Sequence, residues 1–193
     1  GNIARKRNWI LQNIKRPLVM IDDDVSGLGY GEGGKQQLHL DSDTALDVMK
    51  QLTNLAYQWE CPLFGLNVNE DGRNYQEYRP FLLTSVVLGP FQGHLGHDLY
   101  YDERMGTKDD FDMSLQVLRR YKRVLRCNKY CYFTAHGDNP GGIVSTRTME
   151  KEEKYCRAIM RKWGTGVIKY RLPPRKMGDL LNAAKVNVPI RGV

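Results

Sequence analysis

The chain has 193 residues, of which 41% are hydrophobic and 26% charged, a balance typical of folded globular proteins and unlike that of disordered or coiled-coil sequences. Its formal net charge is +7, and residues 119–193 carry 18 basic and 5 acidic residues, whereas residues 1–118 carry 11 basic and 17 acidic ones. We therefore expect one domain over residues 1–193, with an acidic half at 1–118 that binds a cation and a basic half at 119–193 that faces a polyanion. The alternative for the basic half is a solvated, lysine-rich surface.

The sequence contains no pattern typical of a membrane span or a disulfide framework. Its longest apolar stretch, residues 81–91, is interrupted by polar residues, glycine and proline, and is shorter than the roughly 20 residues that a membrane helix needs. The basic N-terminal segment lacks the continuous apolar core of a secretory signal. We expect a cytoplasmic protein without membrane contact, whose cysteines are reduced core residues: Cys61, Cys127, Cys131 and Cys156.

In the acidic half, apolar residues at helical spacing predict an amphipathic helix over residues 3–14. Pro17 ends this helix, and the continuous apolar run at 18–21 is typical of a buried parallel strand. The glycine-rich residues 26–34 predict a mobile loop rather than a regular element. A second helix is expected from about residue 44 to residue 58, capped by Asp43.

The remaining elements alternate between strands, turns and helices. Strands are expected at 63–68, 81–88 and 124–133, and helices from 109 to 118 and from 149 to 163. Residues 69–74 predict a turn, residues 135–142 a loop, and residues from 164 onward an irregular basic tail. Because helices and strands alternate along the chain, we expect an α/β fold with an open, mostly parallel sheet flanked by helices.

Three consecutive aspartates follow the first predicted strand. Asp22, Asp23 and Asp24 come directly after a buried strand, at the edge where open α/β sheets bind ligands. Adjacent carboxylates repel one another and need a cation, and oxygen ligands of this kind favour Mg²⁺ or Mn²⁺. Because side chains alternate along a strand, Asp22 and Asp24 point the same way and Asp23 points to the other side. The alternative is a solvent-exposed acidic turn.

A second group of acids opens the helix predicted at 109–118. Asp109, Asp110 and Asp112 lie in its first turn, where one of them is a candidate general base if its neighbours raise its pKa. Acids at this position also stabilise a helix through its dipole, which is the structural alternative. His136, in the loop at 135–142, is a candidate metal ligand, whereas His94 and His97 have no further zinc ligands near them in the sequence.

Taken together, these segments resemble a known family. The succession GNIARKRNWIL, VMIDDDV, KDDFDMSL and a histidine loop resembles GT-A glycosyltransferases, and GLNVN, YRPFLLTSVVLGPFQGH, FTAHGDNPGG and KVNVPIRGV are most similar to the TET/JBP-associated glycosyltransferase family. That family is implicated in sugar transfer to hydroxymethylated pyrimidines in phage DNA. The resemblance covers nearly the whole chain. GT-A domains normally begin with a strand–helix–strand unit that binds the nucleoside, and in this sequence that unit is missing or diverged.

The resemblance implies a role for each matching residue. Residues that would contact the donor nucleotide sugar are Arg7, Asn8, Asp22 and Asp23. Asp22 and Asp24 would bind Mn²⁺ or Mg²⁺ with His136 as a further ligand, and Asp110, beside Asp109, would be the catalytic base. The implied protein is a hexosyl- or pentosyltransferase of a bacterial host cell's cytoplasm, with the loop at 26–34 closing over the donor.

The acceptor is predicted from the basic half. Its cations are interleaved with aromatic residues that could stack on flipped bases: Tyr121, Tyr130, Tyr132, Tyr155, Trp163 and Tyr170. DNA carrying a hydroxymethylated pyrimidine is therefore the expected acceptor, and a protein acceptor is the alternative. Two other hypotheses are a catalytically inactive nucleic-acid-binding module and a metal nuclease, the latter disfavoured because no lysine or histidine is closely spaced with residues 22–24.

Overall fold

The structure is a computed structural model, and it describes residues 2–31, 38–68, 75–134, 147–181, 183 and 185–188. The turn expected at 69–74 and the whole loop expected at 135–142, with His136, lie outside the described residues.

The described segments form helices and short strands in alternation. The helices are α1 (Ile3–Asn13), α2 (Ser42–Gln58), the 3-10 helix η2 (Glu103–Lys108), α3 (Asp109–Tyr121), α4 (Met149–Trp163) and α5 (Gly178–Leu181). The strands are β1 (Leu18–Ile21), β2 (Val25–Tyr30), β3 (Leu38–His39), β4 (Leu63–Asn67), β5 (Phe81–Leu82), β6 (Phe91–His94), β7 (Leu125–Thr134), β8 (Ile168–Lys169) and β9 (Lys185–Val186). None of the helices in these ranges combines the length and apolarity needed to cross a bilayer.

The main sheet is mixed, with strand order β1-β6-β4-β7-β2-β3 and β5 paired to β7. Strands β4 and β7 pair in parallel, and every other strand pair described in this sheet is antiparallel. The α/β class is therefore confirmed, but the expected mostly parallel sheet is wrong. The physical reason is β6: it follows β5 without a crossover helix and inserts between β1 and β4, running antiparallel to both.

The glycine-rich segment after the three aspartates is not the loop that its composition predicts. Residues 25–30 form β2, which pairs with β7 on one side and β3 on the other. Glycine is required here by close packing: a Cβ on Gly29 would lie 2.5 Å from the ring of Phe133, which also stacks on His39 at 4.0 Å between ring centroids. The lid expected over residues 26–34 is therefore wrong for its first part, which is a strand inside the sheet.

The strand expected at 81–88 is confined to β5. The apolar residues beyond it turn toward α3, where Val87 bonds side chains instead of a neighbouring strand. Its N–H donates to Ser114 Oγ (2.9 Å), and its carbonyl oxygen accepts from Ser114 Oγ (2.8 Å) and Gln92 Nε2 (3.0 Å). Because side chains satisfy this backbone, the chain can leave the sheet and return as β6.

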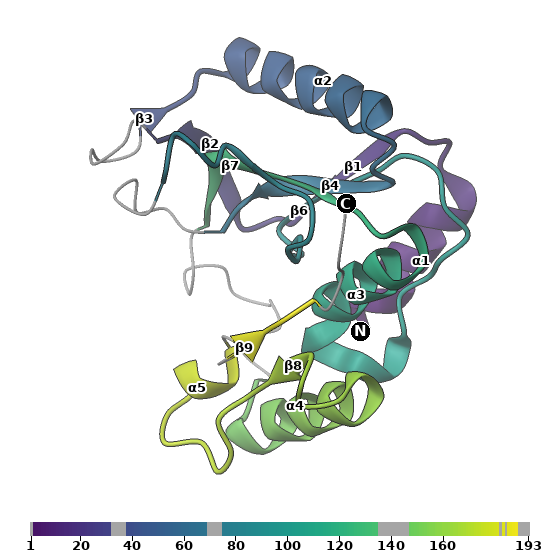
Figure 1. The fold of residues 1–193 in the computed structure, drawn as a ribbon, viewed down its shortest axis with the longest axis vertical. Coiled ribbons are helices and arrows are strands. Elements are labelled where there is room, and N and C mark those ends of the chain that lie inside the picture. The colour runs from purple at the N-terminus through teal and green to yellow at the C-terminus, as the bar shows by residue number, and fades with distance from the viewer. Residues whose placement is uncertain are drawn as a thin grey trace.

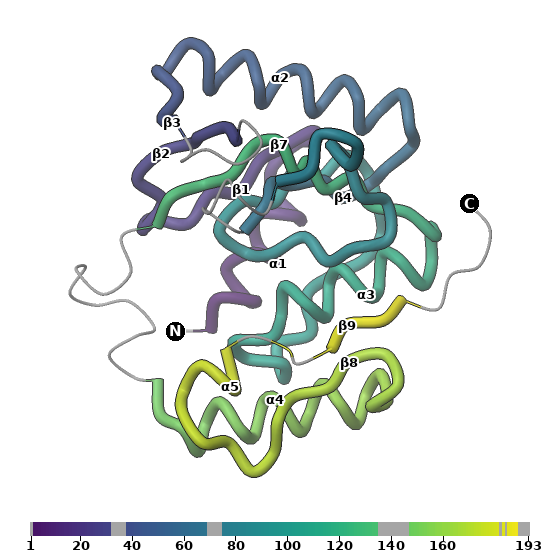
Figure 2. The backbone as a smooth tube through the Cα atoms, turned by 60° about the vertical axis from the view of Figure 1, so that its left-hand side comes forward, coloured from purple at the N-terminus to yellow at the C-terminus, as the bar shows by residue number. Residues whose placement is uncertain are grey.

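Helices cover both faces of the sheet (Figure 1), and the core forms three clusters of buried side chains. The first lies between α2 and the sheet, and the second between the sheet, α1 and α3. The third joins α3 to α4 and β8, so α3 contributes side chains to both clusters on its side of the sheet. Figure 2 shows α2 and α4 at opposite ends of the molecule. The four cysteines are buried and free, as predicted.

Candidate functional site

The acids predicted to act together are gathered by a single buried arginine. Arg7 lies on α1, Asp22 follows β1, and Asp109 opens α3. Arg7 Nη2 donates to Asp22 Oδ1 and Oδ2 (3.0 and 3.1 Å), and Arg7 Nη1 donates to Asp109 Oδ2 (3.1 Å). Only 6% of the Arg7 side chain and 4% of that of Asp109 is exposed, against 30% of that of Asp22. Asp22 therefore forms the solvent-facing side of this cluster.

The backbone of Gly89 connects Arg7 to the other acid at the start of α3. Its carbonyl oxygen accepts from Arg7 Nη2 (3.2 Å), and its N–H donates to Asp110 Oδ2 (2.9 Å). A Cβ at this position would lie 2.8 Å from Arg7 Nη2 and 3.3 Å from Asp110 Oδ2. Only glycine therefore lets these two side chains come so close to the backbone at residue 89. Asp110 Oδ1 also accepts from the Phe111 N–H (2.7 Å), which holds this carboxylate at the helix N-terminus.

Burial and charge shift the pKa values of this cluster. Burial raises the pKa of Asp22 and that of Asp109, the latter to about 7, although the nearby Arg7 guanidinium acts in the opposite direction. Burial alone would lower the pKa of Arg7, but the neighbouring acids, Asp109 first, raise it overall. The cluster therefore contains more negative charge than one guanidinium balances.

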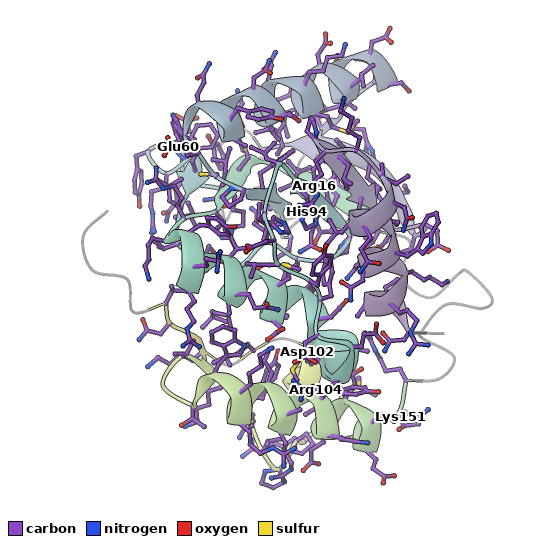
Figure 3. All side chains as sticks on the ribbon, turned by 90° about the vertical axis from the view of Figure 1, so that its right-hand side faces the viewer. Arg16, Glu60, His94, Asp102, Arg104 and Lys151 are labelled. Atoms are coloured by element: carbon purple, nitrogen blue, oxygen red, sulfur yellow. The ribbon has the colours of Figure 1, made fainter. Side chains whose placement is uncertain are left out.

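A buried polar network lies beside Arg7. The guanidinium carbon is 5.5 Å from the centre of the Tyr101 ring. The Tyr101 hydroxyl donates to Gln92 Oε1 (2.6 Å) and lies 3.1 Å from His94 Nε2, while His94 Nδ1 lies 2.9 Å from His97 Nε2. Figure 3 labels His94 in the interior beside Arg16, whose guanidinium donates to the His97 carbonyl oxygen. Burial lowers the pKa of both histidines, that of His97 to about 4.

Asn8, expected to contact the donor, is engaged with the backbone of the same network. Its Nδ2 donates to the Tyr101 carbonyl oxygen (2.9 Å), and its Oδ1 accepts from the Tyr101 N–H (2.7 Å). Both polar ends of the amide are thereby used to fix the segment that follows β6. In this structure Asn8 positions Tyr101, which in turn lies against Arg7.

The residues expected to hold a metal ion are only partly brought together. Asp22 and Asp24 are near enough that the charge of Asp24 contributes to the raised pKa of Asp22, whose largest cause is burial. Within the described residues, no group of three or more His, Cys, Asp or Glu side chains could hold an ion. Two carboxylates still suit Mg²⁺ or Mn²⁺, because such ions usually take one or two protein carboxylates and complete their shell with substrate phosphate. Asp23 is exposed.

Two residues lie at this site in a role that the sequence did not indicate. Gly89 had a usable signal, since the Gly-Pro pair ends an apolar run, but nothing in the sequence connected it to Arg7. Tyr132, on β7, was expected to stack on DNA and is instead buried. Burial raises its pKa, with further contributions from the charges of Asp110, Asp22 and Asp24, so the phenol lies within electrostatic reach of all three acids.

The third acid of the α3 group, Asp112, belongs to a different contact. It is fully buried and accepts hydrogen bonds from Trp163 Nε1 (2.7 Å) and Lys162 Nζ (2.9 Å), both from α4. Trp163 and the buried Tyr170 therefore pack between elements, which corrects their expected role as stacking residues. Among the described residues, the exposed cations of the basic half lie at the end of α3, on β7, on α4 and on the segments after it: Arg119, Arg120, Lys122, Lys129, Lys151, Lys154, Arg157, Arg161, Lys162, Lys169, Arg171, Arg175, Lys176 and Lys185.

Comparison of the chain with protein-family models, curated proteins and solved structures gives no match in any of the three. The functional assignment therefore depends on the residues and geometry described above.

Proposed function

We propose that this chain is a metal-dependent glycosyltransferase with a GT-A-like fold. It would move a sugar from a nucleotide sugar to a hydroxyl acceptor, a hydroxymethylated pyrimidine in DNA. The observation that carries the proposal is the convergence of Arg7, Asp22, Asp109 and Asp110 from three separate segments of the chain at one end of the sheet. These are the residues to which the family resemblance gives donor-binding and catalytic roles.

Asp22 and Asp24 are the side chains that would hold Mn²⁺ or Mg²⁺, an ion that neutralises the charge of the departing diphosphate. Asp22 is the more exposed acid bound to Arg7, so it is the one that a donor can reach. Arg7 also holds the buried Asp109 and the Gly89 carbonyl, which keeps the start of α3 in place while Asp22 changes partner. This division makes Asp109 a positioning residue.

Asp110 is the proposed general base. Its two oxygens already accept backbone N–H bonds, from Gly89 and Phe111, which fix the carboxylate in one orientation. In the transfer, the acceptor hydroxyl oxygen forms a bond to the anomeric carbon as that carbon's bond to the diphosphate oxygen breaks. The bonding electrons leave with the diphosphate, and the hydroxyl proton passes to Asp110.

The test is a direct assay of the DNA product. Hydroxymethylated and unmodified DNA are incubated with the protein, Mn²⁺ and a panel of nucleotide sugars, and the digested nucleosides are weighed by mass spectrometry. The expected result is a gain of one sugar on the hydroxymethylated base only, abolished by chelator and by Asp110→Asn. Asp47→Asn, an exposed aspartate on α2, is the matched control and should retain activity. Absence of transfer with every donor would refute the proposal.

A second function is favoured by one observation, the pairing of Asp22 with Arg7. If that pair is permanent, the chain is a nucleic-acid-binding module whose acids only stabilise the fold. Its DNA affinity would fall steeply with salt, because binding releases counterions from the phosphates. Affinity unchanged by Asp24→Asn, together with no sugar transfer, would identify this function instead of the first.

A further inference from the structure

The end of the sheet at β1 has a free edge with a defined hydrogen-bonding pattern. β1 pairs with β6 alone, and no strand of the described part of the chain lies on its other side. The Asp22 N–H donates to the Pro90 carbonyl (3.1 Å), and these two residues lie opposite each other in the antiparallel register. Backbone bonds alternate sides along a strand, so Met20 also bonds to β6, whereas Val19 and Ile21 direct their N–H and C=O groups outward.

Apolar side chains accompany this edge. Ile21 is 47% exposed at the end of β1, and α1, which leads into β1, exposes Trp9 (60%) and Ile14 (48%). Figure 1 shows α1 at the right-hand margin of the molecule, with no labelled element beyond it. Ile21, on the unpaired strand, and Ile14, shortly before it, are exposed large apolar residues of the kind that another polypeptide covers.

The two ends of β1 carry opposite charge. Lys15 and Arg16 precede the strand, and the acids of residues 22–24 follow it. A strand with this arrangement complements its own copy when the two run antiparallel, because each basic end then meets an acidic end. Parallel pairing of two copies would instead place like charges together. The charge pattern therefore selects a second copy, in one orientation, as the occupant of this edge.

We propose that two copies of this chain pair through their β1 strands, antiparallel about a twofold axis at Met20. In this register, Val19 of each copy lies opposite Ile21 of the other, and each such pair exchanges both of its backbone hydrogen bonds. The sheet then continues from one copy into the next, Ile21 is covered, and the exposed Lys15 of each copy comes near the acidic turn of its partner. An isologous contact of this kind closes after two copies.

The first test is the mass of the protein in solution. Sedimentation is measured over loading concentrations from about 1 to about 100 µM, the range in which weak specific dimers form. We expect a shift from the chain mass of 22.2 kDa to twice that value. Ile21→Lys should weaken association at least about tenfold, because the edge would then carry a charge that pairing must desolvate. Leu46→Lys, on α2 and equally exposed at 48%, should associate like the unchanged protein. A monomer throughout, or an Ile21→Lys variant that still dimerises, would overturn the proposal.

The second test needs no substitution and reports the register. Amide hydrogen exchange is followed by NMR at low and high protein concentration. The Met20 amide, bonded to β6, should exchange slowly at both concentrations, whereas those of Val19 and Ile21 should become slow only at the higher one. If the protein dimerises and these two amides continue to exchange fast, the contact lies elsewhere and the proposal fails.

Discussion

Replacing Arg7 by methionine tests how strongly one guanidinium holds the acidic cluster together. Methionine keeps an unbranched apolar stem but removes every hydrogen bond to Asp22, Asp109 and the Gly89 carbonyl. The pair with Asp109 is nearly fully buried on both sides. Removing one partner of a buried pair leaves an uncompensated charge and typically costs about 3–5 kcal/mol. We expect Arg7→Met to lower the free energy of unfolding at pH 8 by that amount.

The loss should depend on pH, with a sign that follows from Asp109. Its pKa in the folded protein, about 7, lies above the value of about 3.9 typical of unfolded chains. Between these values the folded state binds a proton that the unfolded state releases, so this group's contribution to stability falls as the pH rises. Without Arg7 the pKa of Asp109 moves further upward, because the attraction that opposed the shift is gone. Arg7→Met should therefore cost less at pH 5 than at pH 8.

The assay is urea unfolding followed by circular dichroism at the two pH values. Arg5→Met is the matched control, because Arg5 lies on the same helix and its pair with Glu103 is exposed on both sides. Exposed pairs contribute at most about 1 kcal/mol. The double variant Arg7→Met/Asp109→Asn, which removes the stranded charge as well, should recover part of the loss. If Arg7→Met costs no more than Arg5→Met at pH 8, the reasoning about the buried cluster is wrong.

Three further predictions concern packing, pH and the site. A Cβ on Gly93 would lie 2.0 Å from the buried Phe64 ring. In urea titrations, Gly93→Ala should therefore lower the free energy of unfolding by about 1–3 kcal/mol, and by less when the smaller side chain of Phe64→Leu makes room for the methyl group. The folded-state pKa of His97, about 4, lies below its unfolded value of about 6.5, so the unfolded state binds more protons between these pH values. The free energy of unfolding should therefore fall by up to about 3 kcal/mol from pH 7 to pH 4, and by less in His97→Gln. Gly89→Ala, whose methyl group would meet the Arg7 guanidinium, should abolish the proposed sugar transfer while circular dichroism shows a folded protein; full activity would contradict the arrangement.

Elements with a clear periodic pattern could be predicted from the sequence. The helix expected at 149–163 and the strand expected at 18–21 have those bounds in the structure, and the strand expected at 63–68 ends one residue earlier. The buried parallel setting expected for residues 18–21 is nevertheless wrong, because β1 lies at the edge of the sheet, pairs antiparallel with β6 and exposes Ile21. The second helix begins at Ser42, two residues before its expected start, because Asp41 rather than Asp43 is its cap and accepts from the Thr44 N–H (2.9 Å).

The errors occur where a long-range contact overrides local composition. Glycines at 26–34 predict a loop, but Gly29 is needed so that the Phe133 ring can lie on β2. β6 was not predicted because half of its residues are polar. Gln92 and His94 can be buried there because residues outside the strand satisfy their polar groups with hydrogen bonds. No local pattern contains the partner of such a contact, so neither strand could be assigned from composition.

The same limit explains how much of the candidate site could be predicted from the sequence. The sequence shows charged residues, and the positions of Asp22, Asp109 and Asp110 at element ends were enough to select them as candidates. It does not show which charge balances which, because that depends on the meeting of α1 with the start of α3. Once Arg7 is known to bind both Asp22 and Asp109, the question about this site changes from whether acids are present to which of them can exchange its partner. Exposure decides it: water reaches Asp22 but not Asp109, so only Asp22 can leave Arg7 without stranding a buried charge.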